Sequence, residues 1–139
     1  MSTGLGSGEA ILESFVAAIN RRDPDALFSL MTADHLFIDS LGNRVLGAET
    51  MRGGWRGYFA MCPDYKITPV EVLAGLGVVL ATGTASGTIA NTAWVTPAAW
   101  QATIRDGKIA EWRVFADNRP VYEILARTAN PATHSDSPA

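Results

Sequence analysis

The segment MTADHLFIDSLG, residues 31–42, has the pattern of a short strand followed by a turn. Apolar and polar side chains alternate over residues 35–40, which is typical of a strand with one buried face. The Gly-Asn pair that follows has the composition of a tight turn. Alternation puts three side chains on one face of the strand: His35, Phe37 and Asp39.

The residues before this strand predict two helices. Apolar side chains recur at i, i+3, i+4 and i+7 over residues 12–19, which indicates one apolar helix face. The Asp23-Pro24 pair then starts a second, short helix, because Asp is a favoured N-cap and Pro fits the first helical position. Both helices can bury an apolar face against a sheet.

The residues after the strand predict a third helix and then a mainly β region. The helical period returns over residues 47–61, and a final short helix follows residue 118. The Asp106-Gly107 pair marks a hairpin turn, and residues 90–97 have the pattern of an irregular link. The further strands are expected at residues 65–74, 77–89, 98–104 and 109–116.

This order of elements predicts an α+β fold in which three helices pack on one face of a strongly curved, mixed or antiparallel sheet. We expect a flexible N-terminus at residues 1–8, one domain at residues 9–127 and a disordered tail at residues 128–139. A length of 139 residues suits one domain with one core.

The composition limits the possible partners and sites. A net charge of −3, without a cluster of Lys and Arg, predicts neither a nucleic-acid nor an anionic membrane partner. No apolar run approaches the roughly 20 residues of a membrane-spanning helix. One cysteine cannot form an intrachain disulfide, and with two histidines we expect no metal site. We therefore expect a cytoplasmic protein without a metal.

Several short segments, in this order, resemble the nuclear transport factor 2-like superfamily, which includes SnoaL-like polyketide cyclases and ketosteroid isomerases. They are FVAAIN at 15–20, DPDAL at 23–27, residues 31–42, Gly47 and DGKIAEW at 106–112. The resemblance covers residues 9–127. It implies a cone-shaped fold around a hydrophobic pocket, a small hydrophobic ligand, no cofactor and a homodimer. Because the superfamily contains both enzymes and non-enzymatic binding domains, it does not decide the function.

Asp39 is the first candidate for catalysis. The segment at residues 31–42 is similar, without a gap, to the segment that carries the general base of ketosteroid isomerases, and Asp39 falls on that base. An Asp that points into an apolar cavity has a raised pKa and accepts protons near neutral pH. The alternatives are that Asp39 caps the turn that follows it, or that it hydrogen-bonds a ligand.

The resemblance also predicts that steroid isomerisation is absent. The isomerases stabilise their enolate with a Tyr and a protonated Asp. The same alignment puts Phe15 at the Tyr position and Trp100 at the Asp position. Because neither side chain supplies an acidic donor, the isomerase mechanism lacks its oxyanion hole.

Asp117 and His35 are weaker candidates. The residues before Asp117 resemble the closing strand of polyketide cyclases and epoxide hydrolases, where a carboxylate acts as acid or base. The alternative is that Asp117 or Asn118 caps the last helix. For His35 we expect a place at the exposed start of its strand rather than a catalytic role.

Six aromatic side chains are candidates to line an apolar pocket. The alternative for each is that it fills the core. They come from the helices and from the two strands of the last hairpin, and they are Phe15, Trp55, Tyr58, Phe59, Trp100 and Trp112.

The sequence leaves three functions open. One is cofactor-free acid/base catalysis of the isomerase, cyclase or dehydratase type, with Asp39 as base. Another is a carrier or sensor that binds a small molecule without chemistry. The third is a dimerisation module that uses the outer sheet face, including Gln101, Thr103, Glu111 and Arg113.

Overall fold

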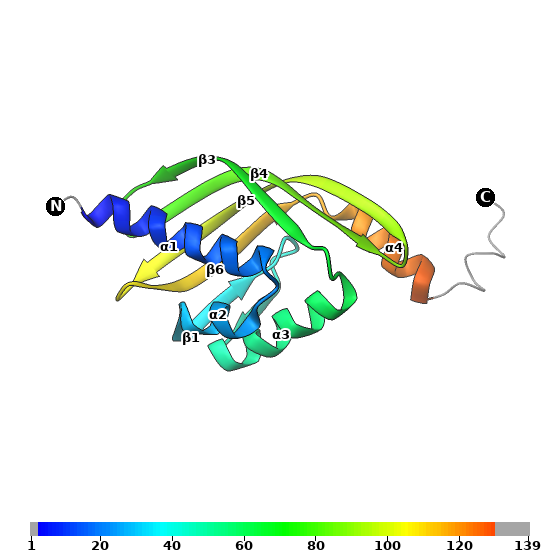
Figure 1. Cartoon of the computed structure of the whole chain (residues 1–139), viewed down its shortest axis with the longest axis horizontal. Helices are drawn as coiled ribbons and strands as arrows, with labels where there is room; N and C mark the ends of the chain where they lie inside the picture. Colours follow the sequence, from blue (N-terminus) through cyan, green and yellow to red (C-terminus); the bar gives the residue numbers. More distant parts are fainter. Residues whose placement is uncertain (1–2, 130–139) are drawn as a thin grey trace.

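The computed structural model describes residues 3–129 and contains four helices and one six-stranded sheet (Figure 1). Of the tail expected at residues 128–139, residues 128–129 belong to the last helix, and residues 130–139 lie outside the described residues. In chain order the elements are α1 (Thr3–Asn20), α2 (Pro24–Ser29), β1 (Met31–Ile38), β2 (Arg44–Leu46), α3 (Ala48–Met61), β3 (Lys66–Ala74), β4 (Val78–Ile89), β5 (Thr92–Arg105), β6 (Lys108–Ala116) and α4 (Arg119–Ala129).

The sheet is mixed and has the strand order β2-β1-β6-β5-β4-β3. Only β1 and β6 pair in parallel, and their register places Phe37 opposite Trp112. The sheet is open, because β2 and β3 form its two edges. The α+β class and the mixed sheet are confirmed, whereas the cone shape stays a prediction.

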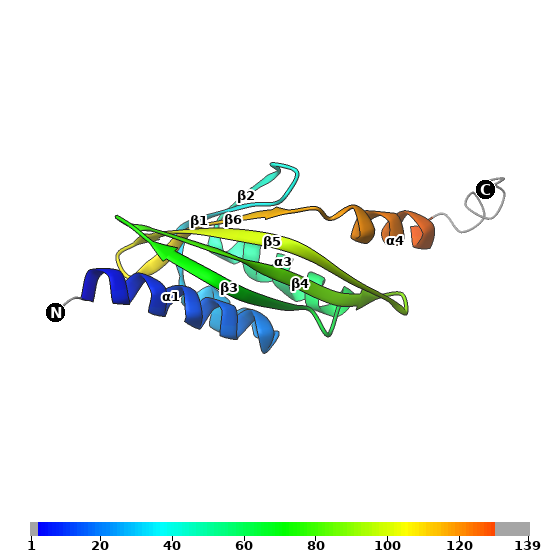
Figure 2. The same ribbon diagram turned by 90° about the horizontal axis from the view of Figure 1, so that it is seen from above.

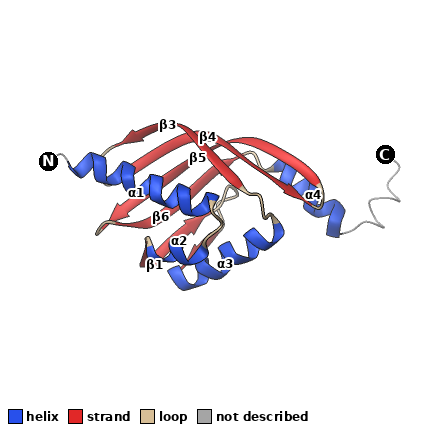
Figure 3. Ribbon diagram, viewed as in Figure 1, coloured by secondary structure: helices blue, strands red, loops and turns tan. Residues whose placement is uncertain are grey.

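Three helices lie along one face of this sheet, and α4 lies beyond the end of β6 (Figures 1, 2 and 3). α1 contacts β3, β4 and β6, whereas α3 contacts β1 and β2. α2 packs between α1 and α3. Its N-cap is Asp23, whose Oδ1 accepts a hydrogen bond from the Ala26 amide at 3.1 Å, as the sequence predicts.

The strands differ from the predicted ones in two places. The short strand β2 was not expected, and β5 begins at Thr92, within residues 90–97, where the sequence suggested an irregular link. This stretch contains Pro97, and proline cannot donate a hydrogen bond to a sheet. β6 ends at Ala116, opposite Ala98, so at Pro97 the strand has only β4 as a neighbour. A proline is tolerated at such a position.

Two glycines of β4 allow close packing. A Cβ on Gly83 would lie 1.9 Å from the Thr68 carbonyl oxygen, next to an irregularity of β3 between Pro69 and Glu71. A Cβ on Gly87 would lie 2.3 Å from the Cys62 sulfur. Neither position accepts a larger residue without moving its neighbours, so both fix how β4 meets the adjacent chain.

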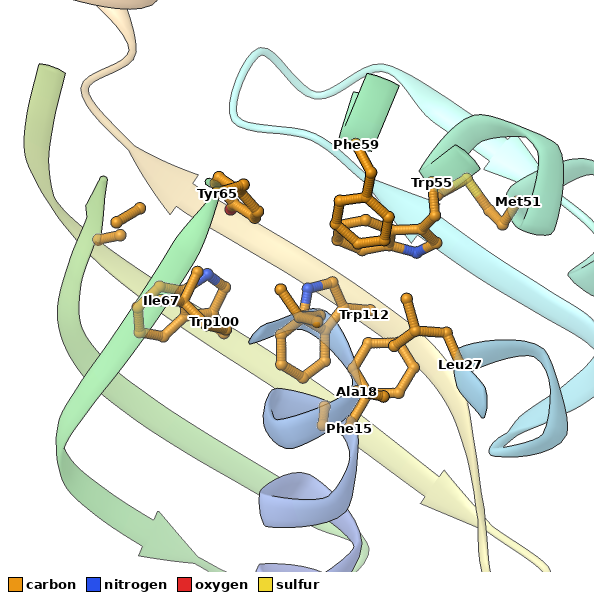
Figure 4. Packing of buried hydrophobic residues seen from close by; sticks show 14 of the residues in the cluster. Phe15, Ala18, Leu27, Met51, Trp55, Phe59, Tyr65, Ile67, Trp100 and Trp112 are labelled. Atoms are coloured by element: carbon orange, nitrogen blue, oxygen red, sulfur yellow. The ribbon is translucent and has the colours of Figure 1, made fainter. Parts of the chain in front are cut away.

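The core lies between α1 and the inner face of β5 and β6 (Figure 4). Phe15 is fully buried, and its ring centroid is 4.6 Å from that of Trp112. The largest fully buried side chains are Trp100, Trp112, Phe15, Leu12, Ile19 and Leu27. No helix among residues 3–129 is long and apolar enough to cross a membrane.

His35 is buried, with 0% exposure, which corrects the expectation of an exposed strand start. Its Nδ1 lies 2.9 Å from the Ile109 carbonyl oxygen. A carbonyl only accepts, so Nδ1 carries the proton and Nε2 does not in the neutral ring. Nε2 has no partner within the described part of the chain. Burial lowers the pKa of His35, and the Ile109 hydrogen bond and the charges of Glu111 and Asp34 oppose this shift.

We predict that acidification below about pH 6.5, the ordinary pKa of histidine, lowers the free energy of unfolding. The folded chain binds the His35 proton less readily than the unfolded chain. Stability attributable to His35 is therefore present above the unfolded pKa and is lost as the pH falls toward the folded pKa. The slope can reach about 1.4 kcal/mol per pH unit.

Urea unfolding from pH 7.5 to 5 measures this dependence. In His35→Asn, whose amide can still donate to Ile109, the dependence in this window should shrink. The variant His134→Gln shows what the other histidine contributes. An unchanged pH profile in His35→Asn would contradict the assignment.

Candidate functional site

A cavity with a volume of about 330 Å³ lies between α3, the C-terminal ends of β1 and β6, and α4. Its wall is mainly apolar and aromatic. The lining residues are Phe37, Asp39, Ser40, Val45, Met51, Gly54, Trp55, Tyr58, Tyr65, Val114, Asn118, Val121, Tyr122 and Leu125. A volume of this size is at the lower end of small-molecule pockets.

Two helices supply half of this wall through their periodicity. On α3, Met51, Gly54, Trp55 and Tyr58 follow one another at i, i+3, i+4 and i+7, so they share a face. The same spacing recurs from Asn118 through α4. Each helix therefore presents one face to the cavity.

All three tyrosines of the chain line the cavity. The rings of Tyr58 and Tyr65 are perpendicular, with centroids 4.9 Å apart. Burial raises the pKa of both phenols above their ordinary value. These tyrosines are thus neutral at physiological pH, and they can donate a hydrogen bond to a ligand.

Asp39 lines the cavity and also caps the turn that follows β1. Its Oδ1 accepts hydrogen bonds from the backbone amides of Leu41 and Asn43, each at 2.9 Å. Its Oδ2 accepts one from the Asn43 side-chain amide at 3.0 Å. The turn-capping alternative is therefore realised in the structure. The same carboxylate borders the cavity, so its role as a base stays a prediction.

Trp55 contributes a buried donor without an acceptor. It is 5% exposed, stacks on Phe59 with centroids 5.4 Å apart, and meets the edge of Phe37 at 6.0 Å. Its indole Nε1 has no hydrogen-bond partner among residues 3–129. A buried N–H without a partner is costly.

Asp117 borders a different cavity from Asp39. It is exposed, and its Oδ1 accepts a hydrogen bond from the Arg119 amide at 3.1 Å, at the start of α4. It lines an outer groove of about 410 Å³ and does not belong to the wall of the inner cavity. The structure thus does not bring the two candidate carboxylates together in one pocket.

The six aromatic candidates divide between cavity and core. Trp55 and Tyr58 line the cavity. The other four do not: Phe15, Phe59, Trp100 and Trp112 are buried in the core cluster. Figure 4 shows Phe15 beside Trp112 and Phe59 beside Trp55. The reason is that α1 packs on the inner face of the sheet, with Phe15 against Trp112, so these side chains fill the space that the sequence assigned to a ligand.

Sequence reasoning missed several wall residues. The signal for Tyr122 was its i+4 spacing from Asn118, which puts both on one helix face. Tyr65 has no such signal, because it follows a turn and precedes β3. No group of three or more His, Cys, Asp or Glu side chains in the described part of the chain could hold a metal ion.

Comparisons with known proteins agree on the fold. The family model of the SnoaL-like domain matches residues 12–112. A structure from Jannaschia sp. CCS1, described as a SnoaL-like polyketide cyclase, is 17% identical with a TM-score of 0.79, over 88% of this chain and 93% of that one. An LEH-like epoxide hydrolase from M. tuberculosis is 17% identical with a TM-score of 0.77, over 92% and 98%.

A third similar structure, from Catenulispora acidiphila, has a ketosteroid isomerase-like fold and was determined in complex with trimethylamine. It is 23% identical with a TM-score of 0.70, over 76% of this chain and 83% of that one. No curated protein sequence matches this chain. At these identities the solved structures establish the fold and leave the activity open.

Proposed function

The chain belongs to the SnoaL-like domain family, and from this premise we propose that it binds a small, mainly apolar ring compound in the cavity between α3 and α4. The aromatic wall of the 330 Å³ cavity carries the proposal. Asp39 is its one carboxylate among the described residues, and no Lys, Arg or His side chain lines it. Such a wall favours an uncharged ligand over an ionic one.

The polar groups of the wall indicate what the ligand carries. Tyr58 and Tyr65 line the cavity, and their phenols are hydrogen-bond donors. A carbonyl or hydroxyl oxygen on the ligand would accept from them. We therefore expect an oxygen-bearing aromatic or polyketide-like compound rather than a plain hydrocarbon.

We propose proton transfer by Asp39 as a second function of the same cavity, and its position in the wall supports this. The carboxylate would accept a proton from a carbon next to a carbonyl, which leaves an enolate, and would return the proton to another carbon. The neutral phenols of Tyr58 and Tyr65 would stabilise the enolate oxygen. Non-catalytic binding is the alternative, since Asp39 already serves the turn.

Binding is tested by titrating tryptophan fluorescence with aromatic polyketide-like compounds, steroids and terpenoids. Trp55 lines the cavity, whereas Trp94, Trp100 and Trp112 do not. We expect saturable quenching by at least one class in wild type and in Trp94→Phe, and loss of most of it in Trp55→Phe. Quenching that persists in Trp55→Phe would place the ligand elsewhere. No response to any class of compound would contradict the binding proposal.

Catalysis is tested by following deuterium incorporation from D₂O into a bound ketone by NMR. A base at Asp39 predicts that Asp39→Asn lowers the exchange rate by about 10²–10⁴-fold. The affinity should change only a few-fold, because Asn is nearly isosteric. Equal exchange in both proteins, or no exchange in wild type, would leave binding as the function.

We further propose that the outer face of the sheet binds a second copy of the chain. The register aligns Leu73, Leu80, Gln101 and Arg113 in one row across four strands, on the face opposite the helices. Leu73, Leu80 and the nearby Phe115 are exposed. An exposed apolar patch of this kind commonly marks an interface.

Sedimentation velocity tests the interface. We expect a dimer for wild type and a shift to monomer in Leu80→Glu, because a buried unpaired carboxylate opposes association. Leu41→Glu is the control, since Leu41 is also exposed, at 68% against 36% for Leu80, but lies in the turn after β1. A monomeric wild type would rule out the interface.

A further inference from the structure

The inner cavity and the outer groove share a wall. Ser40, Asn118 and Tyr122 are the three residues that line both of them. The outer groove is lined in addition by Leu41, Ala116, Asp117, Arg119, Glu123 and Ala126. The three shared side chains therefore separate an aromatic inner space from an outer groove whose lining includes charged residues.

A hydrogen bond between two distant parts of the chain holds this wall. The Asn118 side-chain amide donates to the Ser40 hydroxyl at 3.0 Å, which joins the segment after β6 to the segment after β1. The Tyr122 amide donates to the Asn118 carbonyl at 3.0 Å, so both residues lie on the first turn at the start of α4. The Tyr122 side chain is 38% exposed, as expected for a residue between two hollows.

Two of the three wall residues, Asn118 and Tyr122, lie in a part of the chain that the family model does not cover. The match ends at residue 112, whereas Asn118 and all of α4 follow it. Figure 2 shows α4 beyond the end of β6 and away from α1. The segment that closes the inner cavity thus follows the matched region, and a segment at the cavity wall is well placed to set specificity.

The volume of the inner cavity limits the ligand. An engineered protein cavity of about 150 Å³ holds one benzene ring, and the inner cavity, at about 330 Å³, is roughly twice that size. Two fused rings thus fill it. A longer ligand that extends toward the outer groove has to pass the shared wall at Tyr122.

We propose that Tyr122 is the specificity-determining residue that limits the ligand to about two fused rings, and that the Asn118–Ser40 hydrogen bond keeps its helix turn in place. The proposal rests on the proposed binding of a ring compound in the inner cavity. Trimming Tyr122 would connect the inner cavity with the outer groove and admit a longer ring system.

The test compares two fluorescent probes by anisotropy: 2-naphthol, with two fused rings, and 1-hydroxypyrene, with four. Wild type should prefer 2-naphthol by about ten-fold or more, the discrimination that a fitted apolar pocket provides. Tyr122→Ala should reduce this preference by about ten-fold. Tyr122→Phe, which keeps the ring and loses the hydroxyl, should retain it. Equal preference in wild type and Tyr122→Ala, or tight binding of 1-hydroxypyrene to wild type, overturns the proposal.

A measurement without a ligand separates this proposal from the binding proposal. Acrylamide quenching of tryptophan emission should increase in Tyr122→Ala, because Trp55 becomes more accessible, and the increase should vanish in a Trp55→Phe background. Asn118→Ala should also increase the acrylamide quenching, and it provides the test if Tyr122→Ala does not fold. If no probe binds but quenching increases, the binding proposal is wrong, whereas the role of Tyr122 in separating the two hollows is supported. If quenching is unchanged in both variants, that role of Tyr122 is contradicted.

Discussion

The parallel pairing of β1 with β6 is the contact on which the site depends. It joins residues about 75 positions apart and puts the C-terminal ends of both strands at the same edge. Asp39 and Ser40 leave one strand there, and Asn118 follows the other, so the two segments meet. Without this pairing the wall of the cavity would be in separate parts of the molecule.

The pairing is supported from the buried side. His35 Nδ1 donates to the Ile109 carbonyl, and the Ile109 amide donates to the Leu30 carbonyl at 2.8 Å. Asp34 and Arg105 add an ion pair at the exposed end. The bond from His35 is buried and replaceable by few other side chains, whereas an exposed ion pair contributes little. His35 is thus a structural residue of the fold, and its role explains why a titratable group occurs in the core.

The same packing decides where a ligand can lie. Phe15 from α1 covers Trp112, and Trp100 is buried beside them. Burying a Trp removes roughly 150–250 Å² from water, worth about 4–6 kcal/mol. Displacing these rings to make room for a ligand would cost much of the stability of the domain. The cavity remains at the other end of the sheet, between α3, α4 and the C-terminal ends of β1 and β6.

The sequence patterns predicted the features that depend on interactions between neighbouring residues. The stripe of α3, the Asp106-Gly107 hairpin and the capping of α2 by Asp23 follow from neighbouring residues, and all three occur. The burial of His35 depends on Ile109, 74 residues away, and no local signal contains it. Likewise, alternation placed Trp100 and Trp112 on the inner face but could not show that α1 fills the space in front of them. The separation of Asp39 from Asp117 also needed the three-dimensional course of the chain.

The two functions of Asp39, in the turn and at the cavity, are compatible. Oδ1 takes both backbone amides, which fixes the position of the carboxylate, while Oδ2 has one side-chain partner. An oxygen with one hydrogen bond retains a lone pair that can accept a proton. Fixing a catalytic group before the substrate arrives is how enzymes reduce the cost of reorganisation. Capping the turn can therefore hold Asp39 in place as a base and does not exclude that role. The choice between catalyst and binder depends on whether a ligand carbon reaches Oδ2.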